Sequence, residues 1–303
     1  MADPLFILAP GRTFTSVISG MIGQHPEMYG FPELYLNHSD TLRGWWVQCG
    51  GRRPETILHN GLLRTVAEFF FGEQTDETVA EAKVWIRTRF DWETSTAFHE
   101  LTDRVAPRIA VEKSPFSVRS YKNLERLRIF FPDARFIHLV RHPRPTCASL
   151  LKFDRAANLL GTVAKGYDFS TNPPTLDPQL WWYECHMRIK RFTEELPATH
   201  WIRLRGEEFL KEPRGHLRLV AEWLGLRSDD AAIEEMMHPE RSPFAHFGPP
   251  SAKYGNDPAF LESPEFRPFH DKSESLDNSL SWRPDGRGFR LDVRELAREF
   301  GYQ

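Results

Sequence analysis

Basic and hydroxyl side chains gather in a short segment near the amino terminus, where they could bind an anion. An apolar run at residues 5–9 leads into PGRTFTS (residues 10–16), and the apolar residues behind it share one helical face. This pattern predicts a buried strand, a tight loop and a helix start, whose dipole and amides favour negative charge. Arg12 would add a planar cation, and Thr13, Thr15 and Ser16 would add hydroxyl donors. An ordinary capped helix start is the alternative.

Two further segments place cations at the ends of predicted strands. Arg141 follows the continuous apolar run 136–140, and Ser149 lies eight residues further on. Lys113 belongs to EKSPF (residues 112–116), which follows a strand predicted at 108–111. The carboxyl ends of parallel strands meet at one edge of a sheet, where ligands bind in open α/β folds. Taken alone, Arg141 or Lys113 could be an ordinary solvated side chain. The prediction of a site therefore depends on both residues lying at the same edge of the sheet.

Strands that alternate with helices predict an α/β fold with a central, mainly parallel sheet flanked by helices. We expect strands at 5–9, 108–111, 136–140 and 201–204, and helices at 179–195, 213–224 and 292–300, with further helical segments across 55–104. A single domain would span residues 1–303. The segment from about 240 to 290 is rich in Pro, Gly and Ser, and we expect it to form a flexible flap.

The composition limits the classes of ligand. The 303 residues carry 39 Lys and Arg against 42 Asp and Glu, which argues against general nucleic-acid binding and a polybasic membrane anchor. No apolar run approaches the roughly 18 residues of a membrane helix. Cys49, Cys147 and Cys185 lie far apart, and no His/Cys/Asp cluster has zinc-ligand spacing. We expect a reduced, cytoplasmic protein that requires no metal.

The amino-terminal loop departs from the phosphate-binding loop of ATP-binding proteins. That signature, GxxxxGK[ST], has a second glycine and a lysine ahead of the helix, and the segment PGRTFTS contains neither. A nucleotide-dependent phosphotransferase that binds ATP with magnesium is therefore an alternative that the missing residues disfavour.

Together, the three segments resemble the sulfotransferases that use 3′-phosphoadenosine 5′-phosphosulfate (PAPS). The similarity covers PGRTFTS, EKSPF and FPDARFIHLVRHPRPTCASL, with the spacing of the tyrosylprotein and bacterial branches. RLRGEEFLKEP, VAEWLGL and the terminal LDVRELAREFGY are also similar to family segments. Stretches at 94–101 and 251–264 resemble the sulfotransferase domains of olefin-forming polyketide synthases. The resemblance implies a P-loop-like sulfotransferase fold.

The resemblance also implies roles for individual residues. The 5′-phosphosulfate end would be held by the loop residues Arg12, Thr13, Phe14, Thr15 and Ser16. Arg141 and Ser149 would hold the 3′-phosphate, and Lys113 would lie near the sulfuryl group and the bridging oxygen. Glu33, in FPELY, falls where the tyrosylprotein branch carries its catalytic glutamate. A turn carboxylate is the alternative for Glu33.

The implied reaction moves a sulfuryl group from PAPS to an acceptor hydroxyl and leaves adenosine 3′,5′-bisphosphate, without a metal. Glu33 would accept the proton, and Lys113 and Arg12 would stabilise charge on the leaving oxygen. An apolar pocket would favour a small, lipid-like or polyketide-like acceptor, free or tethered to a carrier in trans. Tryptophans that could line it are Trp45, Trp46, Trp85, Trp92, Trp181 and Trp182. A non-catalytic nucleotide-binding homologue is the alternative from another class.

Two positions depart from the pattern of the family. Phe14 replaces the glycine usual in the loop, so we expect the backbone there to avoid positive φ. Gly206 stands where the family carries a tyrosine, which would remove an aromatic contact to the nucleotide. Both departures bear on nucleotide affinity more than on the chemistry.

Overall fold

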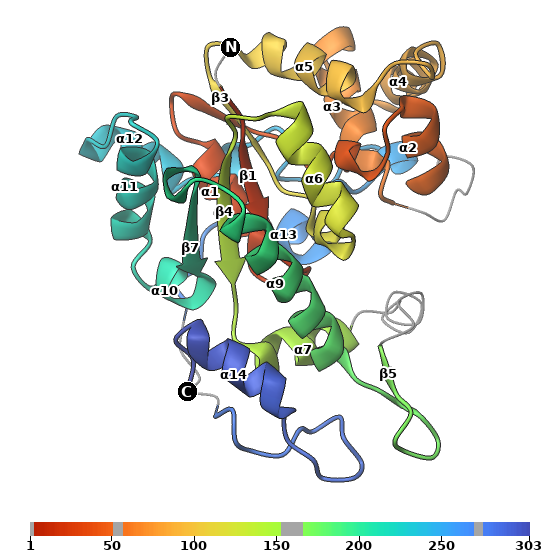
Figure 1. Ribbon diagram of the computed structural model, residues 1–303. Coiled ribbons are helices and arrows are strands. Elements are labelled where there is room, and N and C mark those ends of the chain that lie inside the picture. Colours follow the sequence, from red (N-terminus) through yellow and green to blue (C-terminus); the bar gives the residue numbers. More distant parts are fainter. Residues whose placement is uncertain (1–2, 51–56, 153–165, 270–274) are drawn as a thin grey trace.

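A five-stranded, all-parallel sheet forms the centre of the protein (Figure 1). The computed structural model describes residues 3–50, 57–152, 166–269 and 275–303. The strands are β1 (Leu5–Leu8), β2 (Met28–Gly30), β3 (Ile109–Glu112), β4 (Arg135–Val140) and β7 (Trp201–Arg205), in the order β2-β3-β1-β4-β7. The predicted fold and the four predicted strands are confirmed. The short strand β2 had no prediction, because three residues are too few to show a period.

Strand pairing brings the predicted site segments to one edge of the sheet. β1 pairs in parallel with β3 (Leu5↔Val111) and with β4 (Leu5↔Arg135). Every residue of β1 is buried, as expected for a strand covered on both faces. Because these strands run in the same direction, the segments that follow β1, β3 and β4 emerge side by side.

Helices surround the sheet and confirm the helices predicted near 179, 213 and 292. They are α1 (Thr15–Gly23), α2 (Leu42–Gln48), α3 (Asn60–Phe71), α4 (Asp76–Arg87), α5 (Thr94–Val105), α6 (Tyr121–Phe130), α7 (Pro143–Leu151), α9 (Pro178–Glu194), α10 (Gly206–Lys211), α11 (Pro213–Trp223), α12 (Asp230–Met236), α13 (Pro258–Glu262) and α14 (Leu291–Glu299). A small hairpin joins β5 (Tyr167–Asp168) to β6 (Thr175–Leu176).

Alternate strand residues divide between two hydrophobic cores, one on each face of the sheet. Phe6 and Phe136 pack in a core with residues of α3, α5, α6 and α9. Leu5, Ile7 and Ile137 pack in the other core with residues of α1, α11 and α12. This division follows from the two-residue period of a strand, and it holds the central strands rigidly at the edge where the predicted site lies.

Local signals explain several helix ends. Asp177 caps α9 by accepting a hydrogen bond from the Gln179 amide at 3.3 Å, and Pro178 occupies the first turn. Gly225 adopts φ 71° directly after the end of α11, which confirms the predicted stop at this glycine.

The segment predicted as a flap contains short helices and buried side chains. Within it, α13 contributes Phe260 and Leu261 to a small cluster that packs against Val17 of α1. Residues 270–274 of this segment lie outside the described residues. The flexibility of residues 240–290 and the single-domain boundary stay predictions. Within the described ranges, no helix combines the length and apolar character needed to cross a membrane.

Candidate active site at the carboxyl edge of the sheet

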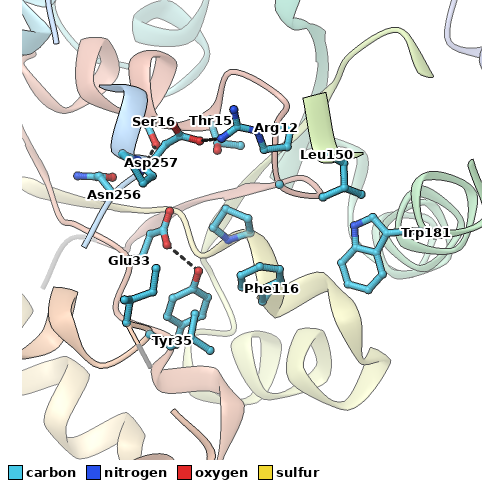
Figure 2. Close-up of a pocket in the computed structure, with 15 residues that line it drawn as sticks. Arg12, Thr15, Ser16, Glu33, Tyr35, Phe116, Leu150, Trp181, Asn256 and Asp257 are labelled. Carbon is cyan, nitrogen blue, oxygen red and sulfur yellow. Dashed lines mark hydrogen bonds and ion pairs between the residues drawn. The ribbon is translucent and has the colours of Figure 1, made fainter. Parts of the chain in front are cut away.

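The segments that follow β1, β3 and β4 meet at one cavity (Figure 2). In this view Glu33 and Trp181 stand at opposite ends, and Phe116 lies between them. The lining consists of Gly11, Arg12, Thr15, Ser16, Glu33, Tyr35, Ile57, Leu58, Pro115, Phe116, Leu150, Trp181, Asn256, Asp257 and Pro258. Charged groups and hydroxyls therefore face the same space as an apolar wall.

The loop after β1 folds tightly. Thr13 is fully buried, and its Oγ1 donates to the carbonyl oxygen of Pro10 at 2.8 Å. Arg12 and Phe14 adopt left-handed backbone with φ 70° and 59°. Phe14 gives no side-chain cap to α1, so its side chain does not compete with an anion for the first helix amides.

The expectation that Phe14 avoids positive φ is wrong. The Phe14 ring lies 4.0 Å from the guanidinium carbon of Arg141 and packs edge-on against Phe269 at 5.5 Å. These contacts offset the strain of a left-handed backbone at a bulky residue. The loop thus retains a conformation that glycine would favour, with an aromatic side chain attached.

Arg12 connects the loop to the segment after β4. Its Nε donates to Ser149 Oγ at 3.0 Å, and its backbone oxygen accepts from Arg141 Nη1 at 2.7 Å. Nη1 of Arg12 forms an ion pair with Asp257. Three residues predicted to hold the two ends of one nucleotide are therefore in direct contact.

Lys113 is a buried cation between two oxygen-bearing side chains. Its Nζ donates to Ser16 Oγ at 2.8 Å and forms an ion pair with Oε1 of Glu33. Oε2 of Glu33 accepts from the Tyr35 hydroxyl at 2.6 Å (Figure 2). The Lys113 side chain is 1% exposed and that of Glu33 is 17% exposed, so the carboxylate faces the cavity and the amine lies beneath it.

The turn that carries Glu33 is held through three consecutive backbone amides, those of residues 33–35. The first donates to the carbonyl oxygen of Gly255 at 2.7 Å, the second to Glu112 Oε1 at 3.1 Å, and the third to Ser114 Oγ at 3.0 Å. Burial raises the pKa of Glu112 to about 7, although the bonds from Ser114 and the turn oppose the rise. The candidate base therefore rests on a fixed backbone.

Two glycines permit the close packing of this turn. A Cβ on Gly61, in α3, would lie 2.1 Å from the carbonyl oxygen of Glu33. Gly255 adopts φ 124°, and a Cβ there would lie 3.1 Å from the Cα of Gly61. Nothing in the sequence next to either glycine indicates this close approach to the turn of Glu33. Glu112, which holds the same turn, was predicted as part of EKSPF without a role of its own.

Asp257 is the charged lining residue that the sequence reasoning missed. Its amide donates to Ser16 Oγ at 3.2 Å, and its Oδ1 caps α13 by accepting from the Ala259 amide at 2.9 Å. Its other oxygen pairs with Arg12. Asp-Pro is a signal for a helix start, but nothing local indicates that this carboxylate reaches a loop 245 residues earlier.

The far end of the cavity is apolar. Of the six tryptophans expected to line an acceptor pocket, Trp181 lines this cavity, beside Leu150 and Phe116. The other five lie outside the lining: Trp45, Trp46 and Trp85 are buried in the core around Phe6, Trp92 packs against that core, and Trp182 is buried in the core around α14. The cavity lining therefore contains one of the six tryptophans predicted for it.

Comparison with protein families identifies the chain. A model of the sulfotransferase family matches residues 4–230. The chain belongs to the sulfotransferase family. Its structure is similar to the sulfotransferase domain from the curacin biosynthetic pathway, with 21% identity, TM-score 0.78, and coverage of 100% of this chain and 99% of that one. Comparison with curated proteins gives no match.

A second solved sulfotransferase structure has the same architecture. The sulfotransferase domain from the Synechococcus PCC 7002 olefin synthase is 23% identical, with TM-score 0.72 and coverage of 100% of this chain and 97% of that domain. At these identities the similarity establishes the fold, which is that of the sulfotransferases.

Gly206, the second departure from the sulfotransferase pattern, lies against Phe14. A Cβ built on Gly206 would stand 2.8 Å from Cδ2 of Phe14. The loop ring therefore fills the space beside residue 206. The lost aromatic contact to the nucleotide stays a prediction, but this sulfotransferase places another aromatic ring next to Arg141.

The predicted anion site contains a partly buried cation, Arg141, with unused hydrogen-bonding capacity. Burial lowers the pKa of Arg141, and its Nε has no hydrogen-bond partner among the described residues. A bound anion would relieve both the desolvation and the missing bond. In the described part of the chain, no three His, Cys, Asp or Glu side chains group as metal ligands.

Proposed function

We propose that this sulfotransferase transfers a sulfuryl group from PAPS to a hydroxyl of a small, apolar or polyketide-like acceptor. The observation that carries the proposal is the contact of Arg12 with both Ser149 and Arg141, beside the Lys113–Glu33 ion pair. These contacts support the proposal because Arg12 and Glu33 line the cavity, and Ser149, Arg141 and Lys113 contact them directly. The products would be adenosine 3′,5′-bisphosphate and a sulfate ester.

The loop and the segment after β4 fit a doubly anionic nucleotide. The loop residues Arg12, Thr13, Phe14, Thr15 and Ser16 would surround the 5′-phosphosulfate end with amides, hydroxyls and a guanidinium. Arg141 and Ser149 would hold the 3′-phosphate. The Nε of Arg141 supports this assignment, because it is buried without a hydrogen-bond partner among the described residues and an anion would supply the missing acceptor.

The residues around Glu33 fit the proton and charge transfers of the reaction. The acceptor oxygen would bond to sulfur as the bond from sulfur to the bridging oxygen breaks, and Glu33 would take the hydroxyl proton. Such proton transfer contributes on the order of 10²–10⁴-fold when well placed. Lys113 and Arg12 would stabilise the charge left on the bridging oxygen, in a site where fixed cations need no reorganisation.

The apolar wall supports an apolar acceptor. Phe116, Leu150 and Trp181 offer contact area and few polar groups, which suits a lipid-like or polyketide-like chain better than a sugar polymer. The fold likeness to sulfotransferase domains of the curacin pathway and of an olefin synthase supports the same class. A carrier protein would deliver a tethered chain. We place the reaction in the cytoplasm, consistent with three free, buried cysteines.

Labelled PAPS supplied with a panel of hydroxylated acceptors, free and carrier-tethered, tests the proposal. We expect transfer to at least one apolar acceptor, and losses of about 100-fold or more for Glu33→Gln and Lys113→Ala. Lys122→Ala is the matched control, because its side chain is 69% exposed on α6. Near-full turnover in both site variants would refute the assigned roles.

Nucleotide binding separates the alternatives without an acceptor. We expect adenosine 3′,5′-bisphosphate to raise the melting temperature more than ATP with magnesium does. The opposite order would favour a phosphotransferase. Tight binding without transfer to any acceptor would indicate a non-catalytic homologue.

A further inference from the structure

Tyr35 is the one residue of the cavity lining that donates directly to the carboxylate of Glu33, among the contacts of the described residues. Its hydroxyl bonds to Oε2 at 2.6 Å, and Lys113 pairs with the other oxygen. The carboxylate is therefore held by a donor at each oxygen, which fixes both its position and its plane.

We infer that Tyr35 is a positioning residue for Glu33: its hydroxyl orients the carboxylate toward the acceptor, so that the carboxylate can accept the proton. The inference rests on the proposed function, in which Glu33 is the general base. It assigns to Tyr35 no contact with the transferred group, so Tyr35 would act through Glu33.

The surroundings of Tyr35 hold its hydroxyl in place. The side chain is 1% exposed, stacks on Phe116 with ring centres 6.1 Å apart, and meets the His38 ring edge-on at 5.0 Å. Its amide donates to Ser114 Oγ, and its backbone is left-handed with φ 54°. A bulky residue rarely adopts this conformation, and such strain is concentrated at functional sites.

The charge state of Tyr35 suits a donor. Burial, followed by the neighbouring Glu33 carboxylate, raises the pKa of Tyr35 well above its usual value, so the proton stays on the phenol. Its short bond to a carboxylate is charge-assisted and strong. The titratable groups that face it or act on it are Glu33, His38, Cys49, Glu112 and, through Glu33, Lys113.

Lys113 alone would not fix the carboxylate during the reaction. The lysine divides its donors between Ser16 and Glu33, and in the proposed reaction it also faces the leaving oxygen. A carboxylate held only by this shared cation would be free to rotate. Tyr35 supplies a second attachment that serves Glu33 alone among the described contacts.

The test compares kcat and KM of Tyr35→Phe, which keeps the ring and removes the donor, with those of the wild type. A carboxylate that is no longer oriented slows the proton transfer and leaves nucleotide binding intact, so we expect kcat to fall about tenfold, with little change in the nucleotide KM. Tyr121→Phe is the matched control, because Tyr121 makes an equally short bond, 2.6 Å, to Glu195 at an exposed position.

A double-variant cycle separates positioning from support of the fold. If Tyr35 acts through Glu33, Tyr35→Phe has no further effect on kcat in the Glu33→Gln background. A purely structural role would instead lower kcat equally in both backgrounds, and that result would overturn the inference.

Infrared spectroscopy provides a readout that needs no turnover. The carboxylate stretching band of Glu33, assigned by its loss in Glu33→Gln, should shift in Tyr35→Phe because the hydrogen-bond donor at Oε2 is lost. An unchanged band overturns the inference. Failure of the wild type to transfer sulfate from labelled PAPS would contradict the proposed function instead, so the two failures are distinct.

Discussion

The ring of Phe14 occupies the space that a side chain at position 206 would need. A Cβ on Gly206 would stand 2.8 Å from Cδ2 of Phe14, and the same ring carries the Arg141 guanidinium at 4.0 Å. The two departures from the sulfotransferase pattern are therefore one coupled exchange. The aromatic ring that packs against Arg141 belongs to Phe14, in the loop after β1, and not to residue 206.

Gly206→Ala tests this coupling. The new methyl group must displace a ring that is packed on both sides, so we expect the free energy of unfolding to fall by about 1–3 kcal/mol. In a Phe14→Gly background the methyl group meets no ring, and most of that loss should disappear. Urea denaturation of the four proteins gives the coupling energy. Equal losses in both backgrounds would contradict it.

Asp257→Asn should strengthen nucleotide binding. The substitution removes the charge that pairs with Arg12, while asparagine can still cap α13. Because this ion pair is partly exposed, we expect a gain of about 2- to 5-fold in affinity for adenosine 3′,5′-bisphosphate, measured by calorimetry. Asp229→Asn is the control, since Asp229 also caps a helix and pairs with an arginine, Arg227. Unchanged or weaker binding would show that Asp257 assists the nucleotide.

Trp181→Phe should affect the acceptor and spare the nucleotide. The indole lines the apolar end of the cavity, so a smaller ring removes contact area, and we expect the acceptor KM to rise about 3- to 10-fold. Trp85→Phe is the control, because Trp85 is 7% exposed in the core and lies outside the cavity lining. A larger change in nucleotide affinity than in acceptor KM would reverse the assignment of the cavity ends.

A buried histidine pair predicts loss of stability in acid. His138 Nε2 and His186 Nδ1 lie 2.9 Å apart between β4 and α9, and both rings are fully buried. Burial lowers the pKa of His186 to about 3 and that of His138 well below its usual value. The unfolded chain binds protons near pH 6.5 and the folded pair does not. Stability is therefore full above about pH 6.5 and falls toward pH 3, by about 1.4 kcal/mol per pH unit for each such proton.

Chemical denaturation across this pH range measures the effect. Replacing both histidines by leucine should make the decline less steep, while His246→Asn, at an exposed position, should leave it intact. A decline of the same slope in the double variant would assign the acid sensitivity to other groups.

The sheet was predictable because its central strands are continuous apolar runs, and such runs indicate strands buried on both faces. Arg141 and Lys113 were placed at one edge for the same reason, since the ends of parallel strands coincide. The approach of Glu33 to Lys113, across 80 residues, came only from the family resemblance. Periodicity in a sequence reports which face a residue occupies and not which distant turn lies opposite.

The missed features depend on tertiary contacts. Asp257 reaches Arg12 from a segment whose composition suggested only a loop. The prediction that Phe14 avoids positive φ was wrong. The preference for glycine at positive φ reflects the local clash of a Cβ atom, and it does not include the contacts of the Phe14 ring with Arg141 and Phe269. Tertiary packing overrides local backbone preference when the side chain makes enough contacts.

The Arg12–Asp257 pair also has a bearing on selectivity among dissolved anions. With the guanidinium already neutralised by a carboxylate, a free sulfate or phosphate ion must displace that partner using the few contacts of a small solute. In the proposed reaction, a nucleotide that touches both the loop after β1 and the segment after β4 would gain enough elsewhere to make the exchange. We therefore expect the abundant inorganic ions of a cell to be weak competitors at this position, and occupancy to follow the concentration of the larger molecule.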